Sequence, residues 1–127
     1  MIMIVDDDVG MAETCAMLLE AYGFEVSTAS SGAEATTKLN GTSPELLIAD
    51  SEVPGVSDIH LGGIFNVQSV ATTVPVLMIS ALARREIPTL QSYDGFLRKP
   101  FLAENLLIEV DRLLPGVYTR PNNLIGA

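Results

Sequence analysis

The chain has 127 residues, 48% of them hydrophobic and 18% charged, which predicts one globular domain and excludes a disordered or collagen-like chain. Its 16 acidic and 7 basic residues give a net charge of -9, which disfavours direct nucleic-acid binding because phosphate backbones attract clustered Lys and Arg. The sequence has no apolar run of membrane-spanning length and no basic signal-peptide start, and its single cysteine cannot form an internal disulfide, so we expect a cytoplasmic protein that binds no membrane.

Short apolar runs alternate with longer amphipathic segments along the chain. In chain order, the pattern predicts a strand at 1–5, a helix at 9–22, a strand at 24–29, a helix at 31–39, a strand at 46–49, a helix between 59 and 70, strands at 74–79 and 95–98, and a helix at 102–114. Ser31 and Glu34 have the spacing of a capping box, and Cys15 lies on the apolar face of the first helix.

Two segments are harder to interpret. Gly62 and Gly63 weaken the helix predicted between 59 and 70, because glycine disfavours helix interiors. Pro88 excludes a long helix over 82–92 and leaves a short helix or an irregular loop.

Five strands that alternate with helical segments predict βαβ units with right-handed crossovers. We therefore expect an α/β fold with a doubly wound, five-stranded parallel sheet and helices on both faces. The predicted elements end near residue 116, and residues 117–127 are interpreted as a C-terminal tail or truncated linker.

Polar residues stand at the carboxyl ends of four predicted strands, where ligands bind in such folds. They are Asp6, Asp7 and Asp8 after the first strand, Asp50 after the third, Ser80 after the fourth and Lys99 after the fifth. Carboxylates at one edge repel one another unless a cation lies among them, and a donor set of oxygens favours Mg²⁺ over Zn²⁺. An aspartate beside a metal and a lysine suits attack on phosphorus to give an acyl phosphate.

Taken singly, each of these residues also has a structural explanation. Asp8 is expected to cap a helix, Ser80 alone is typical of a helix cap, and Lys99 alone is most often a surface charge. Their joint occurrence at predicted strand ends favours a functional site.

Four short stretches occur in order: Ile4-Val5-Asp6-Asp7-Asp8; Leu47-Ile48-Ala49-Asp50 followed by Val53-Pro54-Gly55; Pro75 to Ala81; and Phe96-Leu97-Arg98-Lys99-Pro100-Phe101. With these stretches, residues 1–116 resemble the receiver domains of two-component response regulators. The resemblance implies a flavodoxin-like (βα)5 fold.

The resemblance also implies roles for individual residues. Asp50 would be the phosphoacceptor, and Mg²⁺ would be held by Asp6, Asp7, Asp50 and the backbone carbonyl of Glu52. Lys99 and Ser80 would bind the phosphoryl group, Ala81 would leave access to it, and Phe96 would change rotamer with Ser80. The Lys99-Pro100 peptide bond is expected to be cis.

The implied function is that of a phosphorelay receiver. It would accept a phosphoryl group from a histidine kinase or histidine phosphotransfer protein and switch a protein-binding surface. It would be a signalling phosphoacceptor with slow self-catalysed phosphorylation and dephosphorylation, not an enzyme. Its output would be a downstream protein target or a missing output domain, and the sequence does not predict a dimer.

Departures from the family pattern keep two alternatives open. Val56-Ser57-Asp58 stands where receivers usually carry Asp-Gly, and the span from Ser80 to Lys99 is short, which predicts an atypical, short or irregular fourth helix. These departures suggest a phosphorylation-independent pseudo-receiver that acts as an interaction module. A Mg²⁺-dependent phosphohydrolase is a third reading, but such enzymes commonly need an Asp where this chain has Glu52.

Overall fold

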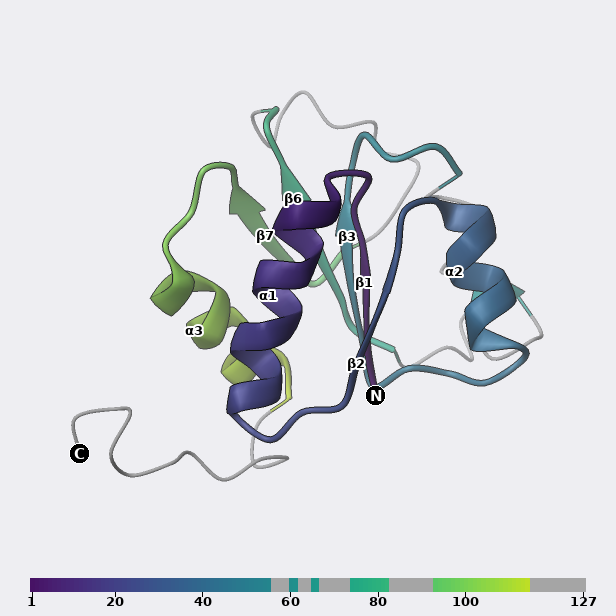
Figure 1. Cartoon of the computed structure of the whole chain (residues 1–127), viewed down its shortest axis with the longest axis horizontal. Helices are drawn as coiled ribbons and strands as arrows, with labels where there is room; N and C mark the ends of the chain where they lie inside the picture. The colour runs from purple at the N-terminus through teal and green to yellow at the C-terminus, as the bar shows by residue number, and fades with distance from the viewer. Residues whose placement is uncertain (56–59, 62–64, 67–73, 83–92, 115–127) are drawn as a thin grey trace.

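A five-stranded parallel sheet forms the centre of the molecule (Figure 1). The computed structural model describes residues 1–55, 60–61, 65–66, 74–82 and 93–114. The strands of this sheet are β1 (Ile2–Val5), β2 (Val26–Ala29), β3 (Leu46–Asp50), β6 (Val76–Ser80) and β7 (Gly95–Arg98). Their order is β2-β1-β3-β6-β7, which confirms the doubly wound parallel sheet predicted from the sequence.

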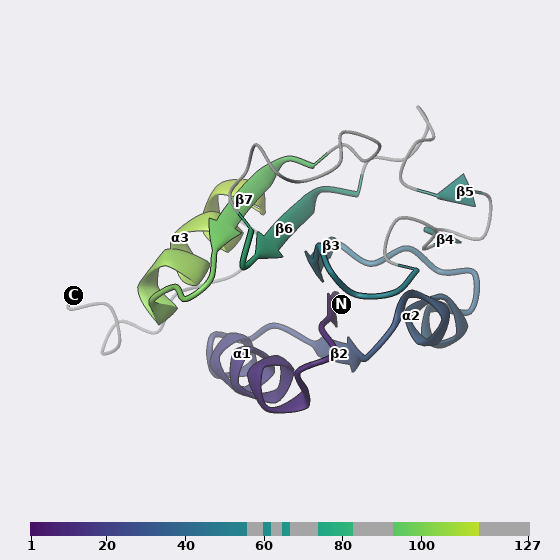
Figure 2. The same ribbon diagram turned by 90° about the horizontal axis from the view of Figure 1, so that it is seen from above.

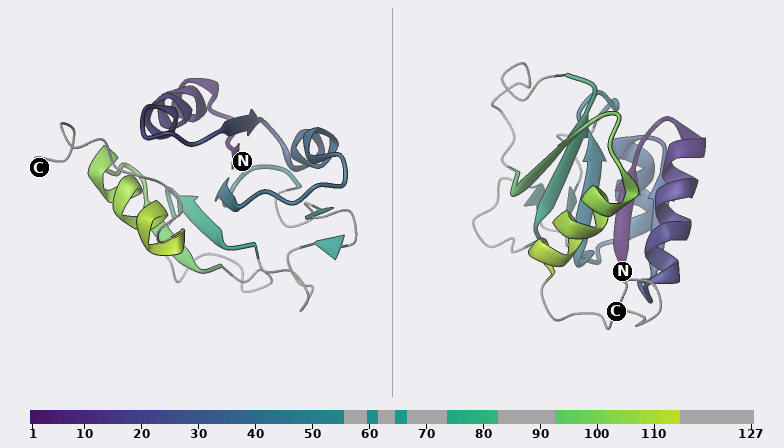
Figure 3. Two further views of the ribbon diagram at one scale, coloured as in Figure 1. Left: turned by 90° about the horizontal axis from the view of Figure 1, so that it is seen from below. Right: turned by 90° about the vertical axis from the view of Figure 1, so that its left-hand side faces the viewer.

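Helices cover both faces of the sheet. They are α1 (Val9–Ala21), α2 (Gly32–Leu39) and α3 (Ala103–Leu113). Seen from above, α1 and α3 lie on one side of the sheet and α2 on the other (Figure 2), and Figure 3 shows the same layers from below and from the side.

The unbroken apolar run of β1 is explained by burial on both faces. Ile2 and Ile4 pack in one core with residues of α1 and α3, whereas Met3 and Val5 pack in the other core with residues of α2. Successive strand side chains point to opposite faces, so a strand covered on both sides needs apolar residues at every position. As expected, Cys15 is buried in the α1 core, and this burial is the main reason why the pKa of its thiol is raised.

Side-chain caps fix the starts of the first two helices. The Asp8 carboxylate accepts a hydrogen bond from the Met11 N–H at 3.1 Å, which confirms its role as a helix cap. The Ser31 hydroxyl accepts the Glu34 N–H at 3.1 Å, and the Glu34 carboxylate accepts the N–H of Ser30 at 2.5 Å. The predicted capping box is therefore present, with its return bond displaced by one residue.

The helix predicted between 59 and 70 is wrong for the residues that the structure describes there. His60–Leu61 and Phe65–Asn66 form β4 and β5, a short antiparallel pair. Two adjacent glycines disfavour a helix by about 1 kcal/mol each, and Phe65 favours a strand. Residues 83–92 and 115–127 lie outside the described residues. The predictions for the fourth helix and for the tail therefore stay predictions.

The loop after β3 rests directly on the start of α2. The Gly32 N–H donates to the Pro54 carbonyl at 2.9 Å, and a Cβ at Gly32 would lie 1.9 Å from the carbonyl oxygen of Gly55. Gly55 itself has a φ of +74°, which favours glycine. Two glycines thus let the loop that carries Glu52 pack against α2.

Candidate functional site

Three aspartates meet where the parallel strands β1 and β3 end. These strand ends lie at the upper edge of the sheet in Figure 1. Asp6 and Asp7 follow β1, and Asp50 is the last residue of β3. One carboxylate oxygen from each lies within 4.8 Å of the others. Asp6 and Asp50 are buried and Asp7 is exposed, so the cluster has a closed side and an open side.

Lys99 joins this cluster from the end of β7. Its Nζ lies 3.0 Å from Asp6 Oδ2 and 2.5 Å from Asp50 Oδ2. Burial alone would lower the pKa of Lys99, but the hydrogen bonds and charges of Asp50 and Asp6 outweigh burial and raise this pKa above its ordinary value. Lys99 is therefore a fixed positive charge between two buried carboxylates, and the peptide bond that follows it is cis, as expected.

Backbone N–H groups orient the two buried carboxylates. Asp6 Oδ1 accepts the N–H of Asp8 at 2.9 Å, and Asp50 Oδ1 accepts the N–H of Glu52 at 2.8 Å. In each carboxylate one oxygen is held by the N–H two residues further along, while the other faces Lys99. This arrangement fixes both side chains with little freedom to rotate.

The donor set fits a divalent cation. Three carboxylates carry three negative charges and Lys99 supplies one positive charge, so two negative charges remain to be balanced. All side-chain donors are oxygens, which favours a hard ion such as Mg²⁺, and the exposed Asp7 leaves room for retained water. The backbone of Glu52 is held at the same place through its bond to Asp50.

Ser80 is the last residue of β6, which pairs with β3, the strand that ends in Asp50. Its side chain is fully buried, and its carbonyl accepts the N–H of Lys99 at 2.7 Å. Its hydroxyl oxygen accepts the hydroxyl of Ser51 at 2.7 Å and the N–H of Leu82 at 2.9 Å. Ser51 was not among the residues predicted for this site, because its contact with Ser80 follows from the β3–β6 register and not from a local sequence pattern.

Ala81 and Phe96 occupy the outer part of the site. Ala81 is exposed, and its carbonyl accepts the Arg98 Nε–H at 3.1 Å. Phe96 is half-buried on β7, where its ring centre lies 6.1 Å from that of Tyr93. A small exposed residue beside Ser80 is consistent with the access predicted there.

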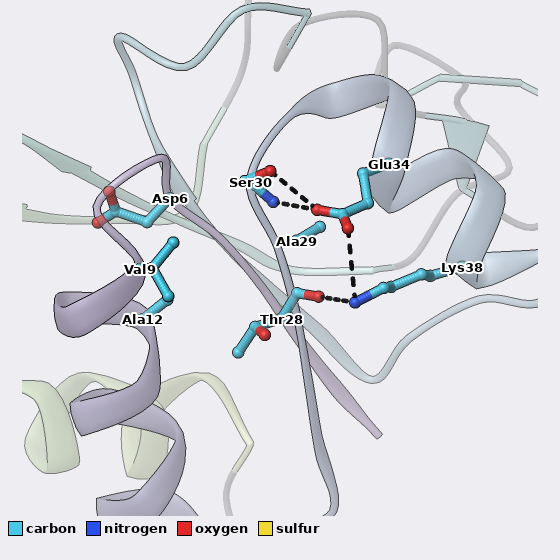
Figure 4. A pocket seen from close by; sticks show the side chains of 8 residues that line it. All are labelled: Asp6, Val9, Ala12, Thr28, Ala29, Ser30, Glu34 and Lys38. Carbon is cyan, nitrogen blue, oxygen red and sulfur yellow. Dashed lines mark hydrogen bonds and ion pairs between the residues drawn. The ribbon is translucent and has the colours of Figure 1, made fainter.

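A hollow of about 150 Å³ adjoins the acidic cluster through Asp6 (Figure 4). It is lined by Asp6, Val9, Ala12, Thr28, Ala29, Ser30, Glu34 and Lys38. Lys38 Nζ donates to the Thr28 carbonyl at 2.6 Å and lies 3.8 Å from Glu34 Oε2. The hydrogen bond that the backbone N–H of Ser30 donates to the Glu34 carboxylate is the main reason why the pKa of Glu34 is lowered. Lys38 and Glu34 are thus paired with each other and with backbone groups.

Comparison with known proteins places these residues in a family. Residues 2–111 match the family model of the response regulator receiver domain. The chain belongs to this family. Receiver domains are signalling modules of two-component systems, and the described part of this chain has no helix long and apolar enough to cross a membrane.

Two similar proteins are transcriptional regulators longer than this chain. The chain is 32% identical to the transcriptional regulatory protein CpxR homolog of Haemophilus influenzae, over 97% of this chain and 54% of that protein. It is also 32% identical to the phosphate regulon transcriptional regulatory protein PhoB of Rhizobium meliloti, over 89% of this chain and 51% of that protein. The receiver thus spans about half the length of these curated relatives.

A solved structure supports the same fold. The chemotaxis protein CheY4 of Vibrio cholerae superposes with a TM-score of 0.70 at 27% identity, covering 88% of this chain and 96% of that chain.

Proposed function

We propose that this receiver accepts a phosphoryl group on Asp50, with Mg²⁺ held by Asp6, Asp7, Asp50 and the backbone carbonyl of Glu52. The observation that carries the proposal is the Lys99 ammonium, 3.0 Å from Asp6 and 2.5 Å from Asp50, in an acidic cluster whose third carboxylate, Asp7, is exposed. Membership of the receiver family supports the assignment.

The proposed reaction is a phosphoryl transfer with aspartate as nucleophile. A carboxylate oxygen of Asp50 attacks the phosphorus of the donor, a P–O or P–N bond breaks, and the leaving group departs with the electron pair. Because Lys99 already contacts Asp50, its ammonium is placed to bind an oxygen of the incoming group. Bound Mg²⁺ would neutralise phosphoryl charge as a Lewis acid.

Ser80, Ala81 and Phe96 are proposed to read the new charge. A phosphoryl group adds about 1.5 to 2 negative charges, and Ser80 would donate a hydrogen bond to one of its oxygens. Ala81 would leave room for the donor. The hydrogen bond of Ser80 to the phosphoryl group would draw the loop after β6 inward, and the Phe96 ring would change rotamer with that loop. The resulting shift of population would present a different surface to a protein target or output domain.

The donor is proposed to be a phosphohistidine on a histidine kinase or a phosphotransfer protein. The match to the response regulator receiver domain supports this proposal, as does the similarity to the transcriptional regulatory proteins CpxR homolog and PhoB. The net charge of -9 argues against direct contact with nucleic acid by this domain, so any such contact would be made by another domain or partner.

Intact mass spectrometry tests the proposal directly. The chain is incubated with phosphoramidate, a P–N donor, or with acetyl phosphate, each with and without Mg²⁺. We expect one phosphoryl adduct that requires Mg²⁺ and is absent from Asp50→Asn. Asp8→Asn is the matched control, because Asp8 lies outside the three-carboxylate cluster and asparagine still caps the helix.

Absence of the adduct from the wild-type chain, or an equal adduct on Asp50→Asn, contradicts the proposal. If the wild-type chain forms no adduct but still binds Mg²⁺, the phosphorylation-independent interaction module becomes the better reading.

A further inference from the structure

A pair of serine hydroxyls links the ends of β3 and β6. Asp50, the last residue of β3, pairs with Ile79 in the parallel register, so the next residue on each side is Ser51, directly after β3, and Ser80, the last residue of β6. The Ser51 Oγ–H donates to Ser80 Oγ at 2.7 Å, and the Ser51 N–H donates to the Ile79 carbonyl at 2.9 Å. Ser51 is therefore held at both its backbone and its side chain.

The hydrogen bonds of Ser80 leave its own hydroxyl hydrogen for another acceptor. A serine hydroxyl offers one hydrogen and two acceptor positions. Ser51 and the N–H of Leu82 occupy the two acceptor positions of Ser80. Within the described part of the chain, both of its side-chain hydrogen bonds are ones that it accepts. Because Ser80 is 0% exposed, water does not readily take the remaining hydrogen.

We propose that Ser51 is a positioning residue that presets Ser80 as a hydrogen-bond donor to the phosphoryl group on Asp50. This inference rests on the function proposed above. Two paired hydroxyls can exchange donor and acceptor roles by rotating their hydrogens. An anionic oxygen that accepts from Ser80 selects the arrangement in which Ser51 donates, and the 2.7 Å between the two hydroxyl oxygens suits that arrangement.

The pair supplies two effects on phosphoryl transfer. It restricts the rotation of Ser80, so less freedom is lost when Ser80 binds the phosphoryl oxygen. It also polarises the Ser80 O–H bond, because a hydroxyl that accepts hydrogen bonds donates more strongly. Ser51 acts through Ser80 and is not itself a catalytic residue.

The test compares the phosphorylation kinetics of five variants with wild type. Time courses with phosphoramidate and Mg²⁺, followed by intact mass over a series of donor concentrations, give the rate constant at saturation and the half-saturating concentration. We expect Ser51→Ala to lower the saturated rate constant about fivefold, the value of one neutral hydrogen bond, and to leave half-saturation unchanged.

The remaining variants separate positioning from general damage. Ser51→Thr retains the hydroxyl and is expected to keep the wild-type rate. In Ser80→Ala, whose rate is already low, adding Ser51→Ala is expected to have no further effect, since the two residues act as one unit. Ser27→Ala is the matched control, because Ser27 is half-buried on the distant strand β2.

Three results overturn the inference. If Ser51→Ala is phosphorylated at the wild-type rate, the role of Ser51 is refuted and the proposed function stands. Multiplicative rate losses in the double variant would show that Ser51 acts independently of Ser80. Failure of the wild-type chain to form any adduct would remove both the inference and the proposed function.

Discussion

Replacement of Gly32 by alanine tests how tightly the loop after β3 packs against α2. A Cβ at Gly32 would lie 1.9 Å from the Gly55 oxygen and 2.3 Å from the Gly55 carbonyl carbon. Real Cβ atoms essentially never approach another atom more closely than 3.0 Å, so to reach even that distance from 1.9 Å the two segments must separate by about 1.1 Å. Both partners are backbone, so no side chain can rotate to relieve the contact.

The magnitude follows from two costs. Overpacking typically destabilises a fold by 1–3 kcal/mol, and separation of the two segments breaks the Gly32–Pro54 hydrogen bond, worth about 1 kcal/mol. We expect Gly32→Ala to lower the free energy of unfolding by about 3 kcal/mol. Because the displaced loop carries Glu52, we also expect slower phosphorylation of the folded variant.

Gly10→Ala is the matched control. It makes the same change in a helix, but its Cβ would meet only the Asp8 carboxylate oxygen, at an ordinary 3.6 Å. Alanine is a better helix former than glycine, so Gly10→Ala should stabilise the chain by up to about 1 kcal/mol. Urea unfolding of both variants measures the difference. Equal effects of the two substitutions would refute the packing argument.

Three further predictions concern the cap, the lysine and the thiol. Ser31→Ala should lower the free energy of unfolding by about 1 kcal/mol in urea titrations, whereas Ser31→Asp should not, because aspartate also caps helices. The raised pKa of Lys99 contributes stability that is fully present below its ordinary value of 10.5 and is lost as pH rises through the raised pKa. The urea midpoints of wild type and Lys99→Met should therefore converge in that alkaline range, and a constant gap would contradict this. Cys15, buried with a raised pKa, should react with a thiol reagent only as fast as the chain opens, so labelling at the rate of a free thiol would contradict its burial.

The sequence predicted the acidic cluster because strand ends are visible in the pattern. Continuous apolar runs locate strands that are buried on both faces, and a polar residue directly after such a run marks a carboxyl end. In a parallel sheet these ends share one edge, so Asp6, Asp50 and Lys99 were expected to meet there. Their hydrogen bonds at the site agree with that expectation.

The details between those strand ends could not be read in the same way. Ser51 acquires its contact from the β3–β6 register, which no local pattern reports. The approach of Gly32 to Gly55 depends on how a loop and a helix pack, and a lone glycine in the sequence does not specify its neighbour. At the described residues 60–61 and 65–66 the helix expected between 59 and 70 is wrong, because apolar spacing in a short window fits a helix and a strand alike.

Distances along the chain have a consequence for protein synthesis. Lys99 bonds to Asp6, 93 positions earlier, and to Asp50, 49 positions earlier, and the strands β1, β3 and β7 that position these groups belong to one sheet. A nascent chain therefore exposes Asp6, Asp7 and Asp50 to the cell well before the lysine leaves the ribosome. During that interval the carboxylates lack the ammonium that balances them, so the chain should become competent for phosphorylation only after β7 has emerged and joined the sheet edge.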